Sequence, residues 1–205
     1  MSHDTLIHHL VRPCVRWIAP LRVTPNQLTT LRLLTGFSAA VLFARGHGAG
    51  FNAAGVVFLI SMLFDRADGE LARQTGQMSV AGYHYDIWSD CAANIAVFIG
   101  IGFGLSGPET ALGPANIWLG GVAGLAIAVL FWELYVAKLA SVQGYAFLNG
   151  RLVVDPDDAM VLIPILVWFG LAQALLMTAA IIASAVALSF AFVALRSRHN
   201  STKAQ

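Results

Sequence analysis

The sequence predicts an all-α integral membrane protein with six transmembrane helices, preceded by an amphipathic helix at the membrane surface. Three observations indicate this fold class. Of the 205 residues, 58% are hydrophobic and only 11% are charged, whereas a soluble domain carries about 25% charged residues. Apolar stretches of helical length follow one another between residues 26 and 195. At about 20 residues per span, six spans and their loops use most of the chain and leave no room for a separate soluble domain.

The composition also argues against several other classes. The formal net charge is +1, without the clustered basic face that nucleic-acid binding requires, so we expect no nucleic-acid partner. Cys14 and Cys91 are far apart and lie in or beside apolar stretches, which supports neither a disulfide framework nor a thiolate metal site. The first 20 residues contain three histidines and two prolines but no long apolar segment, so we expect no cleavable signal peptide.

Residues 1–22 are predicted to form an amphipathic segment on the membrane surface. Apolar residues recur there at helical spacing: Leu6, Ile7, Leu10, Val11, Val15 and Ile18. Histidines and arginines occupy positions between them, as is typical of an interfacial helix. Pro13 and Pro20 limit its regularity.

The first four spans follow directly from the apolar stretches. They are expected at about Asn26–Arg45, Gly50–Arg73, Gly82–Leu105 and Ala115–Val142. Thr24 can cap the first span, with Pro25 at the favoured first helical position. The fourth is longer than a bilayer requires, so we expect it to tilt or to project beyond the hydrocarbon.

The last apolar block, Ala159–Leu195, is long enough for two more spans, which we expect to turn at Gly170 and Gln173. The spans together predict one membrane domain over residues 23–197. Residues 198–205 are then a polar tail.

The cations predict the orientation, because Lys and Arg accumulate in short cytoplasmic loops. With both termini inside, the cytoplasmic ends and loops contain Arg12, Arg16, Arg22, Arg66, Arg73, Lys138, Arg151, Arg196, Arg198 and Lys203. The opposite side has Arg45, and Arg32 falls inside the first span, where it faces either a polar pocket or the interface. The charged joint between the second and third spans is therefore expected in the cytoplasm. The compact chain is typical of a bacterial cell-membrane protein.

That joint contains carboxylates where they are most costly. Asp65 and Asp68 are three residues apart and share one helix face, and Asp86 and Asp90, four residues apart, share another. A short turn between the two helices would gather all four in one pocket. A single aspartate at a helix end is more often a cap, but packing does not require four acids between two spans.

Four uncompensated anions cannot share a low-dielectric site, so cations must join them or their pKa values must rise. Oxygen ligands suit Mg²⁺, Mn²⁺ or Ca²⁺, and two ions bridged by shared carboxylates would neutralise the set. Mg²⁺ often completes its shell with substrate phosphates, which indicates a diphosphate ligand. Small residues that permit close approach lie nearby at Gly69, Ala72 and Gly82. Arg73 can bind a phosphate in two places.

The spacing D-x2-D-G-x2-A-R-x8-G-x3-D-x3-D, read from Asp65 to Asp90, resembles the signature of the CDP-alcohol phosphotransferases (CDP-alcohol phosphatidyltransferases), membrane enzymes of phospholipid synthesis. The resemblance implies that Asp65, Asp68 and Asp86 bind metal that holds the CDP diphosphate. It implies that Asp90 is the general base on the acceptor hydroxyl and also a ligand of a second ion. The CDP-lipid would contact Asn26, Thr29, Gly69, Ala72, Arg73, Ser79 and Gly82.

The implied reaction transfers a phosphatidyl group from CDP-diacylglycerol to a small hydroxylated acceptor by direct displacement at phosphorus, with release of CMP. It implies two Mg²⁺ or Mn²⁺ ions, a membrane-lipid substrate and a homodimer. His84 lies off the Asp86 and Asp90 stripe, so we interpret it as an interface histidine.

The acceptor remains open between inositol phosphate and glycerol phosphate. Lys138 and Arg151 could bind an acceptor phosphate, or they could instead extend to the lipid headgroups or pair with nearby acids such as Glu133. Cys91 follows Asp90 where phosphatidylglycerophosphate synthases have lysine, and Ser89 is closer to the inositol-phosphate and serine branches. Two other functions also remain: transfer of a CDP-linked headgroup to diacylglycerol, and transport of a divalent cation.

Overall fold

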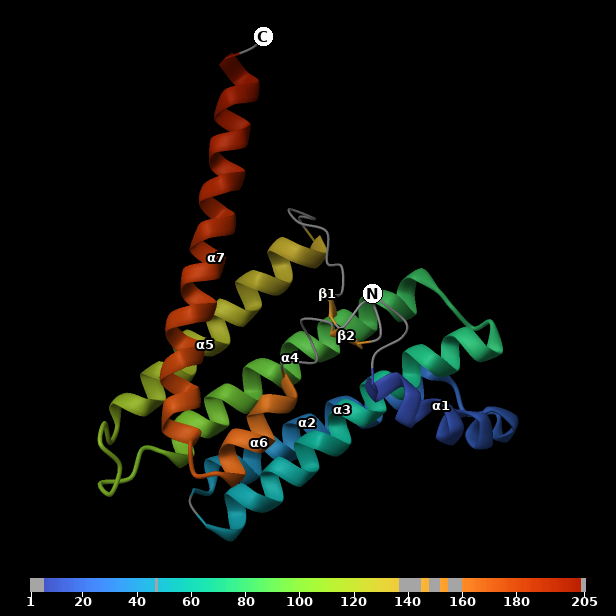
Figure 1. Cartoon of the computed structure of the whole chain (residues 1–205), viewed down its shortest axis with the longest axis horizontal. Helices are drawn as coiled ribbons and strands as arrows, with labels where there is room; N and C mark the ends of the chain where they lie inside the picture. Colours follow the sequence, from blue (N-terminus) through green and yellow to red (C-terminus); the bar gives the residue numbers. More distant parts are fainter. Residues whose placement is uncertain (1–5, 47, 137–144, 148–151, 155–159, 204–205) are drawn as a thin grey trace.

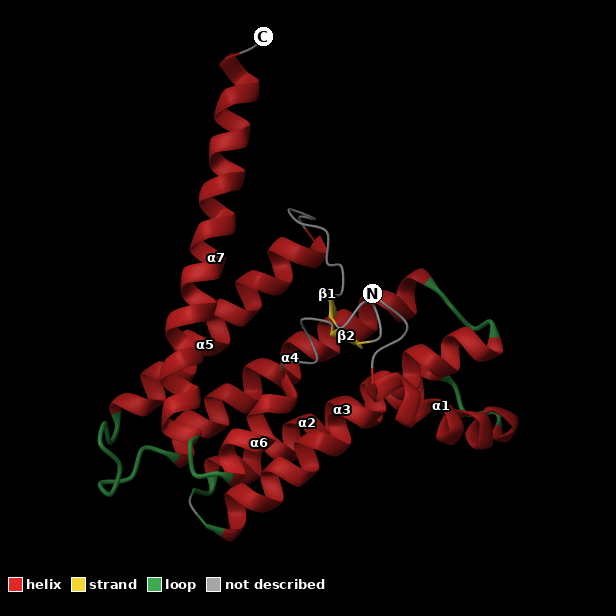
Figure 2. Cartoon of the chain, in the orientation of Figure 1, coloured by secondary structure: helices red, strands yellow, loops and turns green. Residues whose placement is uncertain are grey.

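Helices form nearly all of the part of the chain that the computed structural model describes, which comprises residues 6–46, 48–136, 145–147, 152–154 and 160–203 (Figure 2). The elements are α1 (Leu6–Ile18), a 3-10 turn (Ala19–Leu21), α2 (Pro25–Ala44), α3 (Ala49–Thr75), α4 (Val80–Gly104), α5 (Ala115–Phe131), a π-helical turn (Trp132–Val136), β1 (Tyr145–Phe147), β2 (Leu152–Val154), α6 (Leu162–Trp168) and α7 (Ala172–Lys203). The predicted all-α class is confirmed. The two short strands form one antiparallel hairpin, with Tyr145 opposite Val154.

Four of the described helices are long and apolar enough to cross a membrane: α2, α3 from Gly50, α4, and α7 as far as Phe192. Helix α5 is apolar but has 17 residues before its π-helical turn, and residues 137–142 of the predicted fourth span lie outside the described part. The described part therefore supports an integral membrane protein, while the count of six spans stays a prediction.

The predicted break at Gly170 is present, but the helix before it is short. Helix α6 has seven residues, fewer than the about 20 of a complete span, and residues 155–159 before it lie outside the described part. Gly170 adopts a left-handed φ of 72°. The N–H of Leu171 donates to the carbonyl of Leu166 at 2.8 Å, which closes the helix end in a Schellman motif. Helix α7 then continues to Lys203, so most of the predicted polar tail is helical.

Helices α3 and α4 each pack on α2, α5 packs on α4, and α7 packs on α5 (Figure 1). The core between them contains Ala39, Phe43, Phe51, Phe58, Val97, Phe98, Ile101, Ala123, Ile127 and Leu176. Helix α1 packs on α3 near the C-terminal end of α3. Val11 and Val15 of α1 form a second buried cluster there with Leu28 and Leu71. Each helix that provides carboxylates is thus fixed along its length.

Local signals set the helix ends next to the carboxylates. Pro25 begins α2, and the backbone N–H of Thr24 donates to Gln27 Oε1 at 2.9 Å. Helix α3 ends at Gly76, whose φ of 68° is left-handed. Ser79 caps α4 by accepting the Gly82 N–H at 3.0 Å. The joint between α3 and α4 is therefore only four residues long, from Gly76 to Ser79.

The α4–α5 contact depends on Gly102 of α4 and Gly120 of α5, which face each other. A Cβ on Gly120 would lie 2.6 Å from the Phe98 carbonyl and 3.1 Å from Gly102 Cα, whereas one on the adjacent Gly121 would meet nothing within 4 Å. The two helix backbones are thus in direct contact at this point, as is common between membrane helices.

Gly120→Val is expected to lower the thermal unfolding midpoint of the detergent-solubilised protein, because the added side chain must push α5 from α4, at about 1–3 kcal/mol. Gly121→Val is the matched control, since it carries the same helix penalty without the clash. Size-exclusion chromatography after a temperature series measures both. Equal midpoints for the two variants would contradict the close contact.

Candidate active site

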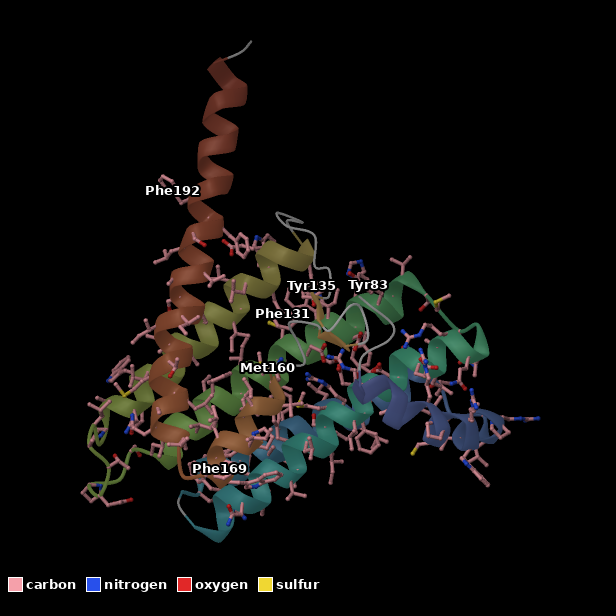
Figure 3. The ribbon with its side chains drawn as sticks, in the orientation of Figure 1. Tyr83, Phe131, Tyr135, Met160, Phe169 and Phe192 are labelled. Carbon is pink, nitrogen blue, oxygen red and sulfur yellow. The ribbon has the colours of Figure 1, made fainter. Side chains whose placement is uncertain are left out.

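Charged and polar side chains from four helices meet near the joint between α3 and α4. Figure 3 shows nitrogen- and oxygen-bearing side chains gathered along α3 beside α1. The groups are Arg12 from α1, Thr29 and Arg32 from α2, Asp65, Arg66, Asp68, Glu70 and Arg73 from α3, and Asp86, Ser89 and Asp90 from α4. Most of them are buried, so each must find a partner within the protein.

Asp65, Asp86 and Asp90 form the centre of the site. One carboxylate oxygen of each lies within 4.8 Å of the others. Ligands on opposite sides of a Mg²⁺, Mn²⁺ or Ca²⁺ ion are about 4–5 Å apart, because metal–oxygen bonds are about 2.0–2.6 Å long. Three all-oxygen ligands at this spacing therefore fit a hard divalent cation. The predicted meeting of the α3 and α4 acid faces has brought these three together.

Asp68 lies beside this set but is hydrogen-bonded to α2. Its Oδ2 accepts a hydrogen bond from Thr29 Oγ1 at 2.6 Å, and the same hydroxyl also contacts the carbonyl of Pro25. Asp68 is buried, with 3% of its surface exposed. The structure thus gathers three of the four predicted aspartates and uses the fourth to join α3 to α2. The interaction between Thr29 and Asp68 has no sequence signal, because the two residues are 39 positions apart.

Arg32 faces the carboxylates, which settles the orientation that the sequence left open. Its Nε lies 2.6 Å from Asp90 Oδ1 and 3.7 Å from Asp65 Oδ1. Its Nη1 donates to the carbonyl of Ser89 at 2.7 Å. Arg32 is 4% exposed, so its positive charge is compensated by groups inside the protein.

Arg66 was counted among the cations of the cytoplasmic ends and loops, and the structure places it within α3, where it is buried. Its Nη1 lies 3.7 Å from Asp65 Oδ2. The hydropathy pattern missed this position because Arg66 precedes the joint by three helical turns and lies among the acids that compensate its charge.

Glu70 is a buried acid that the sequence reasoning did not select. Its Oε2 accepts from Arg73 Nη2 at 2.8 Å, its Oε1 accepts from Gln74 at 2.9 Å, and Arg12 Nε of α1 lies 3.6 Å from Oε1. The signal was present, because Arg73 and Gln74 lie three and four residues after Glu70 on a helix. Arg73, which was expected to bind phosphate, is thus held by Glu70 in this structure.

Three residues expected at the CDP-lipid lie close together although they come from separate segments. A Cβ on Gly82 would lie 2.9 Å from Ser79 Oγ and 3.1 Å from Asn26 Oδ1. Gly69 lies beside Arg73, whose Nη1 would be 3.5 Å from a Cβ there. Ala72 is half-buried. A side chain at Gly82 would therefore collide with two polar groups next to the joint.

His84, Lys138 and Arg151 are the remaining candidates. His84 is exposed and makes an edge contact with Tyr83, with ring centroids 5.6 Å apart. Lys138 and Arg151, the candidates for acceptor binding, lie outside the described residues.

Comparison with known proteins gives a consistent result. The model of the CDP-alcohol phosphatidyltransferase family matches residues 22–186. The chain is similar to the archaetidylinositol phosphate synthase of Pyrococcus horikoshii, with 32% identity over 87 residues. That match covers 42% of this chain and 45% of the relative, so it spans about half of the relative's length.

Two crystal structures of the Mycobacterium tuberculosis phosphatidylinositol phosphate synthase share the fold. The one with CDP-DAG bound has a TM-score of 0.66 at 19% identity and covers 89% of this chain and 93% of that chain. The one in complex with manganese and citrate has a TM-score of 0.60 at 20% identity and covers 89% and 88%.

Asp86→Asn is expected to weaken Mn²⁺ binding by roughly tenfold or more. Mutation of a residue that only hydrogen-bonds a metal ligand already lowers metal affinity by about 10–100-fold. Thermal unfolding of detergent-solubilised protein over a Mn²⁺ titration measures the affinity without any substrate. Glu109→Gln is the control, because that carboxylate lies beyond the far end of α4. An unchanged titration for Asp86→Asn would remove this carboxylate from the metal centre.

Proposed function

The chain belongs to the CDP-alcohol phosphatidyltransferase family, and from this premise we propose that it transfers a phosphatidyl group from CDP-diacylglycerol to inositol phosphate, with release of CMP. The observation that carries the proposal is the set of three carboxylates within 4.8 Å on α3 and α4, at the family spacing. The inositol phosphate acceptor is supported by the synthases to which the chain is similar in sequence and in fold.

The site is proposed to hold two divalent cations, Mg²⁺ or Mn²⁺. Asp65, Asp86 and Asp90 would be the ligands, with Asp68 beside them, and the all-oxygen donor set suits these ions. When bound, the ions polarise the diphosphate and stabilise the negative charge on the departing CMP. The manganese complex of the mycobacterial synthase supports this assignment.

The protein's own groups carry out the proton transfer and the alignment. Asp90 accepts the proton of the acceptor hydroxyl as that oxygen forms a bond to the phosphatidyl phosphorus. The bond between this phosphorus and the CMP oxygen breaks on the opposite side. Reactions of this kind depend mainly on positioning, so an Asp90 that is buried and held by Arg32 suits the role.

The nucleotide is proposed to lie above the joint, against Asn26, Ser79 and Gly82, with Gly69 and Ala72 leaving room for it. Arg73 would exchange its bond to Glu70 for a phosphate oxygen, since a guanidinium binds either anion in the same geometry. Lys138 and Arg151 remain candidates for the acceptor phosphate.

The proposed setting is a bacterial cell membrane, with residues 1–22 at the surface, a six-span domain over residues 23–197, the active site facing the cytoplasm, and a homodimer. Four helices of spanning length support the membrane domain. Trp17 and Leu21 are 81% and 68% exposed and lie beside Arg16 and Arg22. This combination favours contact with an anionic membrane surface.

Purified protein incubated with CDP-diacylglycerol, Mn²⁺ and separate acceptors is expected to form a phosphatidyl product with inositol phosphate. Glycerol 3-phosphate, inositol, serine and choline complete the panel, and mass spectrometry of the lipids identifies the product. Asp90→Asn should reduce turnover by about 10²–10⁴-fold, the usual contribution of general base catalysis. A product only with another acceptor would change the assignment, and full activity of Asp90→Asn would exclude its role as base.

Arg73→Ala is expected to lower the affinity for labelled CDP-diacylglycerol by roughly 10–100-fold, because hydrogen bonds to charged groups contribute about 1.5–3 kcal/mol. Arg45→Ala is the matched control, since Arg45 is exposed at the far end of α2. Equal affinities in the two variants would show that Arg73 does not contact the phosphates.

A further inference from the structure

We propose that Arg32 is a positioning residue of the carboxylate centre, where its guanidinium serves as a built-in cation that holds Asp90 and Asp65 in place before any metal binds. The inference rests on the proposed function, in which Asp90 is the base and the carboxylates bind divalent cations. It assigns a role to an arginine that lies outside the aspartate motif, on the neighbouring helix α2.

The first argument is the cost of the residue's position. Arg32 lies within a helix of spanning length and is 4% exposed. A charged group there is expensive unless it is paired. Its guanidinium meets Asp90 at 2.6 Å, Asp65 at 3.7 Å and the Ser89 carbonyl at 2.7 Å. Because these contacts are all within the protein and the group is buried, Arg32 serves the carboxylates and does not bind the substrate phosphates directly.

The second argument is that the backbone of Arg32 is also fixed. Its carbonyl accepts a hydrogen bond from Ser61 Oγ of α3 at 2.7 Å. One turn later, a Cβ on Gly36 would lie 2.6 Å from the Ala93 Cβ of α4, so α2 and α4 are in close contact there. An arginine fixed at both ends can hold the Asp90 carboxylate in one orientation, which is what a base in a displacement reaction requires.

The third argument concerns charge. Asp65, Asp86 and Asp90 would repel one another at separations below 4.8 Å. Arg32 offsets this repulsion from the α2 side, and Arg66 contacts Asp65 from α3. Without Arg32, the Asp90 charge would be offset mainly when a divalent cation was bound. Loss of Arg32 should therefore harm the metal-free protein more than the metal-bound protein, a pattern that loss of ordinary packing does not produce.

The test compares wild type, Arg32→Gln and Arg32→Lys in detergent, each with EDTA and with saturating Mn²⁺. For Arg32→Gln we expect a lower unfolding midpoint in EDTA and a Mn²⁺-induced increase at least twice that of wild type. Arg32→Lys keeps the positive charge, so it should recover the unfolding midpoint in EDTA. It cannot contact both carboxylates and the Ser89 carbonyl at once, so it should not restore the position of Asp90.

Kinetics separate positioning from stability. Both variants should lose about 100-fold in kcat, within the range of general base catalysis, while the KM for CDP-diacylglycerol changes less than about threefold, as for loss of an interaction in the transition state. In an Asp90→Asn background, Arg32→Gln should cause no further loss in kcat, because it acts through Asp90.

An equal drop in midpoint with and without Mn²⁺, or an increase in KM as large as the drop in kcat, would overturn the role of Arg32. Failure of the proposed function gives a different result: wild type itself would then show neither a Mn²⁺-induced stabilisation nor CMP release. That result would also remove the basis for this inference.

Discussion

The ion pair between Arg32 and Asp90 connects the helices on which the site depends. Both groups are buried between apolar helices, where neither charge is tolerated alone. Their contact sets the position of α2 against α4, and the 3.7 Å approach of the same guanidinium to Asp65 brings in α3. The bond between Thr29 and Asp68 joins α2 to α3 a second time. Charge compensation and helix packing therefore favour the same arrangement of three helices.

The short joint makes this arrangement possible. Helix α3 ends at Thr75 and α4 begins at Val80, and both helices pack on α2. Asp65 of α3 then meets Asp86 and Asp90 of α4 beside that helix. The close glycine contact between α4 and α5 supports α4 from its other side. The carboxylates thus lie on well-packed helices, as a site that acts by positioning requires.

Much of this could be predicted from local sequence signals. Pro25 and Gly170 mark helix ends as expected, and the spacing of the acids identified both the centre and the family. Interactions between distant residues could not be predicted, because periodicity describes one helix at a time. The Thr29–Asp68 bond and the contact of Arg12 with Glu70 are of this kind. Hydropathy alone also overestimated α6, because an apolar composition does not determine where a helix begins.

Within the described part of the chain, the charged groups around the centre come from its first half, between Arg12 and Asp90. This order has a consequence for biosynthesis, since chains are made from the N-terminus at about 5–20 residues per second. Helix α2, which contains Arg32, is synthesised before Asp65 and Asp90. An arginine in the bilayer without its partners is costly, so α2 must stay near the insertion machinery until α3 and α4 arrive. The three helices would then enter the lipid together, with the centre already assembled.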